Sequence, residues 1–147
     1  MKIVNKVIKF KTRFPYNLIK ELYPKHTEYT HKPRMLKFKD GENTIIIFKS
    51  LKGRIMGPSN ELNLKFPIEN VELSTMTITH EFNFFIDLEN TNFIYLPELF
   101  AAGYQRFPEY CNIFHNGKLI ILGVKSIDRA NQLIDIIYNQ ISNSIII

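Results

Sequence analysis

The residue types that most often carry catalysis are present in this chain, but their spacing forms no recognisable catalytic pattern. The four histidines are scattered, and no two stand at the His-x-x-x-His spacing that places two metal ligands on one side of a helix. No phosphate-binding glycine loop and no Gly-x-Ser-x-Gly nucleophile motif occurs. A single cysteine, Cys111, leaves no internal disulfide and no cysteine zinc site. The sequence therefore predicts no enzyme, no metal site and no cofactor, and it favours a structural role for Cys111.

Charge is distributed unevenly along the chain. Residues 1–65 hold 15 Lys or Arg against 5 Asp or Glu, whereas residues 66–147 hold 4 against 9. The overall net charge of +5 thus combines a first part at +10 with a second part at −5. Such a concentration of positive charge predicts contact with a polyanion, and a solvated basic surface is the simpler alternative.

Aromatic residues gather around two strand-like runs in the second half. The stretch Tyr95–Phe100 (YLPELF) is followed by residues 112–126, where an Asn116–Gly117 turn joins two apolar runs. An Asn-Gly pair between such runs predicts a β-hairpin. Phe100 and Phe114 lie beside these runs, where a buried core does not obviously need them. They are candidates for a surface contact, although each alone could be an ordinary core residue.

The spacing of apolar residues predicts the elements that position these side chains. We expect a short helix after Pro15, another over His80–Leu88 and a long one over Asp128–Ile141, capped by Ser126 or Asp128. Residues 57–63 are expected to form a linker. The longest apolar runs have about five residues, too short to span a bilayer, so no membrane segment is expected. Strands are expected at residues 2–13, 34–39, 44–48, 51–56, 71–79, 103–107, 110–115 and 118–123.

The second half repeats landmarks of the first at a separation of 64–66 residues. An internal repeat is a signal at the level of the fold. Strand, helix, several strands and helix, occurring twice, predict an α+β fold with one curved antiparallel sheet and helices on one face. Repeat one is expected to span residues 1–63 and repeat two residues 68–147 of a single domain, with no counterpart in repeat one of helix 128–141. The paired landmarks are Asn5 with Asn70, Tyr29 with Tyr95, Phe48 with Phe114, and Gly53–Arg54 with Gly117–Lys118.

These motifs resemble the second repeat of the TATA-box-binding protein family, strongly over residues 95–126 and weakly over residues 1–57. The family combines a Tyr-x-Pro-Glu-x-Phe run, an Ile-Phe-x-x-Gly-Lys hairpin and a Thr-Gly-Ala-Lys turn. The resemblance implies a saddle with helices on its convex face and two pseudo-symmetric repeats. Its concave sheet would bind the minor groove of AT-rich promoter DNA and bend the duplex. An Asn-, Ile- and Lys-rich composition, typical of AT-rich genomes, favours a divergent viral member.

The resemblance also implies residue roles. Flat apolar wedges unstack base steps at a cost of a few kcal/mol, which wider contact offsets. Asparagine suits the minor-groove acceptors adenine N3 and thymine O2. The implied wedges are Phe48, Phe100 and Phe114, with a fourth at Arg34 or Met35. The implied groove-reading residues are Asn5 and Asn70, and the implied phosphate contacts are Arg54, Arg106 and Lys118.

Two departures from the family leave two functions open. Glu72 stands where the family has an underside valine, and Leu122 replaces the threonine before Gly123. The first hypothesis is a DNA-bending protein that nucleates transcription initiation, in the nucleus or at a site of viral transcription. The second is an interaction module of the same fold that has lost bending and docks a general transcription factor or an RNA polymerase subunit. The tail Ile145–Ile147 is expected to pack under the sheet or to contact a partner.

Overall fold

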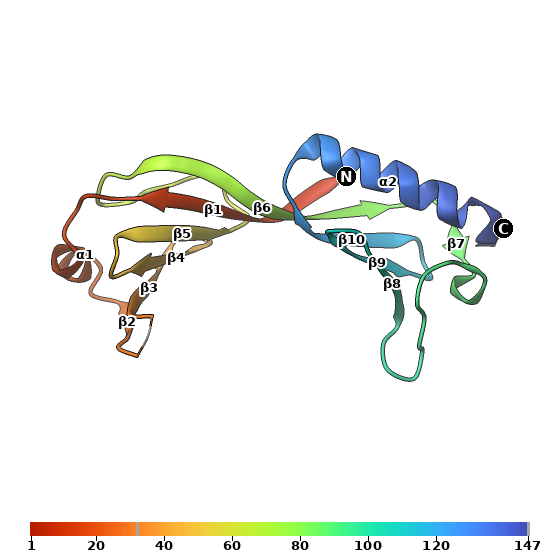
Figure 1. Ribbon diagram of the computed structural model, residues 1–147, viewed down its shortest axis with the longest axis horizontal. Helices are drawn as coiled ribbons and strands as arrows, with labels where there is room; N and C mark the ends of the chain where they lie inside the picture. Colours follow the sequence, from red (N-terminus) through yellow and green to blue (C-terminus); the bar gives the residue numbers. More distant parts are fainter. Residues whose placement is uncertain (32, 147) are drawn as a thin grey trace. The chain divides into compact units, whose positions relative to one another are not determined.

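The computed structural model describes residues 1–31 and 33–146, and it divides into two compact units (Figure 1). Unit 1 comprises Met1–Val4 and Thr75–Ile147, and unit 2 comprises Asn5–Ser74. Strands β1 (Lys2–Lys11) and β6 (Glu69–Glu81) contribute residues to both units. Each unit has its own hydrophobic core, and the two are described separately below.

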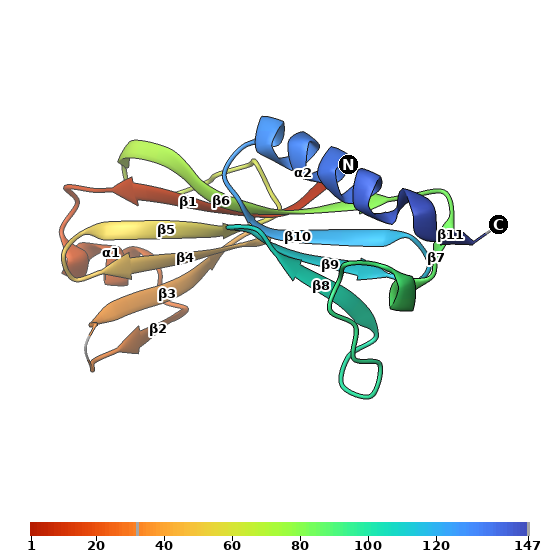
Figure 2. The ribbon, with the colours of Figure 1, turned by 45° about the vertical axis from the view of Figure 1, so that its right-hand side comes forward.

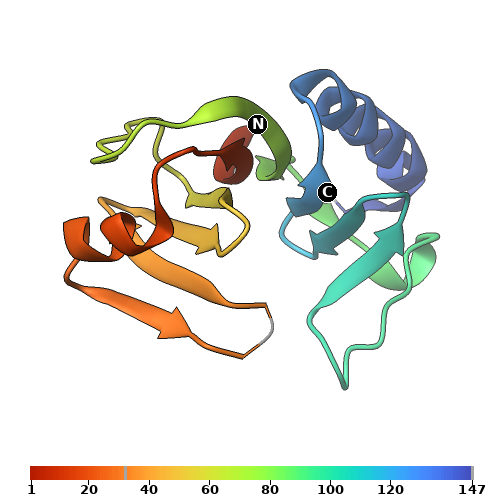
Figure 3. The ribbon, with the colours of Figure 1, turned by 60° about the vertical axis from the view of Figure 1, so that its left-hand side comes forward.

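Unit 2 is an antiparallel sheet with the strand order β2-β3-β4-β5-β1. The new strands are β2 (His26–Tyr29), β3 (Met35–Asp40), β4 (Asn43–Phe48) and β5 (Lys52–Gly57). Buried and exposed residues alternate along β3 and β5, so one face of the sheet packs into the core and the other is open. Helix α1 (Tyr16–Leu22) contributes the buried Tyr16 and Ile19 to the core face (Figure 3, red to orange).

The core face of unit 2 is completed by residues 58–68, which we call the cover segment. Phe66 is buried in the core, and Leu64 and Ile68 pack against it. Side chains of the unit bind the segment along its length: the Thr12 hydroxyl donates to the Pro67 carbonyl (2.7 Å), and the Lys65 amide donates to the Tyr23 hydroxyl (2.9 Å). The segment contains no helix, as expected for repeat one. It is nevertheless a packed part of the unit, so the prediction of a linker captures only its lack of regular structure.

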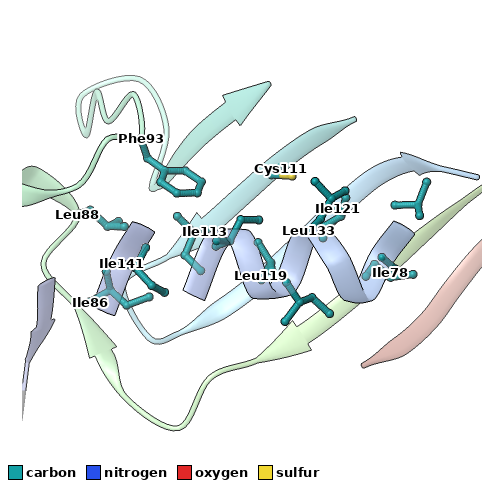
Figure 4. Packing of buried hydrophobic residues seen from close by; sticks show 14 of the residues in the cluster. Ile78, Ile86, Leu88, Phe93, Cys111, Ile113, Leu119, Ile121, Leu133 and Ile141 are labelled. Atoms are coloured by element: carbon teal, nitrogen blue, oxygen red, sulfur yellow. The ribbon is translucent and has the colours of Figure 1, made fainter. Parts of the chain in front are cut away.

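Unit 1 is an antiparallel sheet in which β6 is followed by β10 (Lys118–Val124), β9 (Tyr110–Phe114) and β8 (Ala102–Arg106). Helix α2 (Ile127–Ile141) covers its core face, and the Ser126 side chain caps it by accepting from the Arg129 amide at 3.0 Å. Figure 4 shows how side chains of β9, β10 and α2, among them Ile113, Leu119 and Leu133, meet in this core. The long terminal helix, its cap and the hairpin strands agree with the predictions.

The segment after β6 differs from its prediction. Residues 80–88 form no α-helix: β6 continues to Glu81, and β7 (Phe85–Ile86) and the short 3-10 helix η1 (Leu88–Asn90) follow. Phe82 and Phe84 recur at a period of two residues, stack on each other with centroids 5.4 Å apart and pack against the core. Strand β11 (Ile145–Ile146), reached through η2 (Ser142–Ser144), pairs with β7, which accounts for two isoleucines of the tail. Ile147 lies outside the described residues.

The turn from β4 to β5 in unit 2 and the turn from β9 to β10 in unit 1 show how the two repeats correspond. The Leu51 amide donates to the Phe48 carbonyl at 2.8 Å, and the Gly117 amide donates to the Phe114 carbonyl at 3.0 Å. Both residues have a positive φ, 69° at Leu51 and 90° at Gly117. Leu51 is therefore the counterpart of Gly117. The pairing of Gly53 with Gly117 is wrong: Gly53 lies within β5 opposite Phe10, whose ring fills the space of a Gly53 side chain.

The strand register extends the match between Leu51 and Gly117 to the neighbouring residues. Lys52 stands opposite Lys11, and Lys118 stands opposite Glu81, so Lys52 rather than Arg54 is the counterpart of Lys118. Counting back along β1 and β6 places Thr75 at the position of Asn5. The pairing of Asn5 with Asn70 is therefore wrong in this register, and Asn70, the second residue of β6, has a φ of 53°. Asparagine is among the few residues that adopt this left-handed conformation readily.

Candidate nucleic-acid interface

Strand alternation defines the open face of each sheet. The open face of unit 2 carries Phe48, and the open face of unit 1 carries Phe114. In β4, Ile45 and Ile47 point into the core of unit 2, so Phe48 projects from the opposite face. In β9, Cys111 and Ile113 point into the core of unit 1, so Phe114 projects from the open face of that unit. Both side chains are partly exposed rather than buried. They therefore have the sidedness that a wedge role requires.

The open face of unit 1 carries a cluster of aromatic rings. Phe100, which is 50% exposed, meets Phe114 edge to face with centroids 6.1 Å apart. Tyr104 and Tyr110 stack at 5.6 Å further along β8 and β9. Phe100 ends a loop between η1 and β8 that extends away from the strands of unit 1 (Figure 2, green to teal). The pair of phenylalanines thus forms a stiff apolar ridge at one end of an aromatic surface.

Asn112 is a residue of this face that sequence reasoning missed. Its alternation in β9 places it on the open face between Tyr104 of β8 and Ile120 of β10. It is 8% exposed, and its Oδ1 has no hydrogen-bond partner among the described residues. A buried amide without a partner costs free energy that a ligand can recover. The only signal in the sequence is one polar residue within an otherwise apolar strand.

The remaining predicted residues of unit 1 lie at the margins of this face. Lys118 begins β10 and Arg106 ends β8, and both are exposed. Leu122 is 41% exposed and pairs with Tyr110 across β9 and β10. The register shift in β10 after Ile121 accommodates Leu122 and Gly123, and Gly123 has a φ of 83°. The two exposed cations therefore lie at the ends of strands that carry this face.

The open face of unit 2 carries the other predicted residues. Met35 stands directly opposite Phe48, the position that Ala102 takes opposite Phe114 in unit 1. Met35 is therefore not the register counterpart of Phe100, although it shares a face with Phe48. Asn5 belongs to the same face by alternation with the exposed Lys9 and Lys11 of β1.

A hollow of about 720 Å³ opens on this face of unit 2. Glu72 and Asn70 line it from β6, and Phe48 lines it from the end of β4. Four cations surround the single carboxylate, so Glu72 does not make this region acidic. The cations of the hollow are Lys9, Lys11, Lys52 and Arg54.

Two carboxylates, Glu28 and Glu109, form ion pairs with residues of the helices α1 and α2. The Glu28 carboxylate accepts from Lys20 (2.9 Å) and from the Tyr16 hydroxyl (2.9 Å) on the core side of unit 2, and these bonds lower its pKa to about 2. Burial, followed by the bond to Glu28, raises the pKa of Tyr16 to about 12. In unit 1, a two-pronged bond from Arg129 lowers the pKa of Glu109. These groups anchor helices and contact no open face.

The described residues offer little for other chemistry. Burial raises the pKa of the Cys111 thiol to about 12, which makes it unreactive at neutral pH. No group of three or more metal-ligating side chains is found among residues 1–31 and 33–146. Within the same part of the chain, no helix has the length and apolarity needed to cross a membrane.

Comparisons with known proteins agree with this geometry. The family model "Transcription factor TFIID (or TATA-binding protein, TBP)" matches residues 65–144, more than half of the chain. The solved structure of Methanococcus jannaschii TBP matches with a TM-score of 0.80 at 20% sequence identity, covering 97% of this chain and 98% of that one. No curated protein matches the chain. The structural likeness confirms the predicted α+β fold, and the family match shows that the chain belongs to the TATA-binding protein family.

Proposed function

We propose that this chain is a non-catalytic transcription factor that binds AT-rich duplex DNA in the minor groove and bends it. The open face of unit 1 supports this proposal most directly, because Phe100 and Phe114 form an exposed aromatic ridge beside a stacked tyrosine pair. Rings in this position can unstack a base step, and the aromatic surface behind them can follow the floor of the widened groove.

The other residues take supporting roles in this proposal. Phe48 is a second wedge, with Met35 beside it across the strands. Asn5 and Asn112 face the groove as hydrogen-bonding side chains, and Arg106 and Lys118 contact phosphates at its edges. The bent duplex would then be recognised by general transcription factors or RNA polymerase subunits, in the nucleus or at a site of viral transcription.

The test is binding and bending of an AT-rich duplex with dyes at both ends, using wild type and Phe100→Ala/Phe114→Ala. Stacking of one base on an aromatic side chain is worth roughly 1–3 kcal/mol, so we expect the double variant to lose at least about tenfold in affinity and most of the bend. Phe85→Ala is the matched control, because Phe85 is 54% exposed on β7 and lies outside this face. Absence of binding at low salt, or a bend that the double variant retains, would refute the proposal.

A second candidate is a protein-docking module, favoured by the loop before β8. Leu99 is 81% exposed, and Ile94 and Leu96 are each about half exposed in the same loop. Several adjacent exposed apolar side chains are typical of protein interfaces. If docking alone is the function, Leu99→Ser abolishes capture of a transcription factor or polymerase subunit, and wild type shows no bending of DNA.

A further inference from the structure

The open face of unit 2 is lined by cations in a regular arrangement. Alternation along β1, β3 and β5 places six of them on this face, each beside a buried neighbour that points into the core. None of the six takes part in an ion pair among the described residues. The six are Lys9, Lys11, Lys37, Lys39, Lys52 and Arg54.

The strand register sets like charges directly against each other. Lys9 stands opposite Arg54, and Lys11 stands opposite Lys52, on the antiparallel pair β1–β5. One continuous row across four strands runs Lys37, Ile46, Arg54, Lys9, with three cations in four positions. Like charges directly opposite destabilise a sheet, so this arrangement works against folding unless an anion neutralises it.

The corresponding row of unit 1 contains no charge. Across β8, β9, β10 and β6 it runs Tyr104, Asn112, Ile120, Thr79. Uncharged side chains such as these four can approach base edges without the cost of desolvating a charge. A lysine or arginine in the same place would lose its hydration. The two open faces therefore suit different parts of a nucleic acid.

We propose that these six cations of the open face of unit 2 bind the phosphodiester backbone of the duplex, while preference for particular bases comes from uncharged groove-facing side chains, chiefly Asn112 of unit 1. Lys9, Lys11, Lys52 and Arg54 border the hollow of about 720 Å³, where they outnumber the single carboxylate Glu72, and these four cations form the centre of the phosphate contact. Lysine and arginine bind phosphate oxygens in any sequence, so these six cations supply affinity without specificity. This inference rests on the proposed function, since it assigns separate tasks within DNA binding.

The experiment measures the salt dependence of duplex binding for wild type, Lys9→Gln/Arg54→Gln and the control Lys65→Gln/Lys125→Gln. The control removes the same charge from the cover segment and from the exposed residue after β10. Each lost phosphate contact reduces the magnitude of the slope of log K against log salt by about 0.9. We therefore expect this magnitude to fall by close to 2 in Lys9→Gln/Arg54→Gln and to stay unchanged in the control. The ratio of affinities for AT-rich and GC-rich duplexes should stay at the wild-type value in both.

The outcomes separate this inference from the proposed function. Equal loss of slope in both variants would show a general charge effect and overturn the inference, as would a changed base preference in Lys9→Gln/Arg54→Gln. If wild type bends DNA but the slope of this variant is unchanged, the inference fails and the proposed function stands. If wild type binds no duplex at low salt, both fail. A circular dichroism melt of each variant excludes unfolding as the cause, because relief of like-charge repulsion should leave the melting midpoint unchanged or higher.

Discussion

The open faces of unit 1 and unit 2 present different side chains on equivalent strands. At matched register positions, unit 2 has Lys9 and Arg54 where unit 1 has Thr79 and Ile120. The backbone pairing within these matched rows and the hairpin turn are the same in both units, so the difference between the two open faces lies in their outward residues. This teaches that one strand framework can carry either an uncharged outward row or a row of cations, because outward side chains are free of the core packing that fixes the fold.

The opposite faces differ as well. Unit 1 covers its core with the helix α2, whereas unit 2 uses the irregular cover segment and the short helix α1. A helix satisfies its own backbone hydrogen bonds, but an irregular segment needs side-chain partners. Unit 2 supplies them: Asn43 both accepts from the Ser59 amide and donates to its carbonyl, and Asp40 accepts from the Asn63 amide.

The largest effect is expected from removing the anchor of the cover segment. Phe66→Ala should lower the free energy of unfolding by about 3–5 kcal/mol, similar to Ile137→Ala in α2 at about 2–5 kcal/mol, because both residues are buried in their cores. Urea denaturation followed by fluorescence and circular dichroism measures both values. A loss below about 1 kcal/mol for Phe66→Ala would mean that the segment does not serve unit 2 as α2 serves unit 1.

Exchanging the outward residues should break the contrast between the faces. Ile120→Arg gives unit 1 the cation of unit 2, and we expect a loss of at least about tenfold, or roughly 1.4 kcal/mol, in affinity for an AT-rich duplex, because the charge is desolvated against base edges. Arg54→Ile should keep the bend and lower the salt slope by about 0.9. Fluorescence anisotropy at several salt concentrations measures both. Similar behaviour of the two variants would show that the faces are not specialised.

A smaller effect should follow from Asn112→Ile, which gives unit 1 the residue that unit 2 has at Ile46. Removing an amide whose oxygen has no partner should raise the free energy of unfolding by about 1 kcal/mol. The same change removes a hydrogen-bonding group from the groove-facing surface, so discrimination between A·T and G·C pairs should change by a few-fold. Denaturation and competition binding test these two effects. A destabilised variant with unchanged discrimination would assign Asn112 to the fold alone.

The smallest effect is expected in the acid stability of unit 2. Because the folded-state pKa of Glu28 is lowered to about 2, its stabilising contribution is present above the ordinary value of 4.5 and is lost as the pH falls from 4.5 toward 2. Wild type and Glu28→Gln should therefore converge in melting temperature across this window. Glu109→Gln tests the pair with Arg129 in unit 1 in the same way. Parallel curves over the whole range would show that the carboxylate of Glu28 adds no pH-dependent stability.

Much of the fold could be predicted from the sequence because local patterns agree with it. The Asn116–Gly117 turn, the alternating strands and the apolar stripe of α2 each specify their own structure. Among the elements that the sequence did not predict, β2 has only four residues and lies at the edge of its sheet, where little hydrophobic patterning is required, and β7 and β11 have two residues each. The false helix at residues 80–88 arose because three apolar residues at helical spacing were read without Phe84, which restores a period of two.

The candidate site was predictable only in part. The wedge candidates Phe48 and Phe114 follow from the resemblance to the hairpins of the family, and strand alternation then puts them on the open faces. The cationic row needs the pairing of four strands, which no local pattern contains. The positions of Asn5 and Asn70 depend on the strand register. Sequence separation made the two asparagines counterparts, whereas the register of β1 and β6 makes Thr75 the counterpart of Asn5.

The left-handed conformation of Leu51 has a consequence for tracing the history of the molecule. A leucine at a φ of 69° bears a strain of about 1–2 kcal/mol that glycine would avoid. If the two units descend from one duplicated ancestor, unit 2 has kept the left-handed turn at position 51 although the glycine best suited to it has been replaced by leucine. An alignment scored on residue identity is then drawn to the nearby Gly53, two positions away from the true match. Backbone torsions would be the more faithful ancestral record in strongly diverged repeats of this kind.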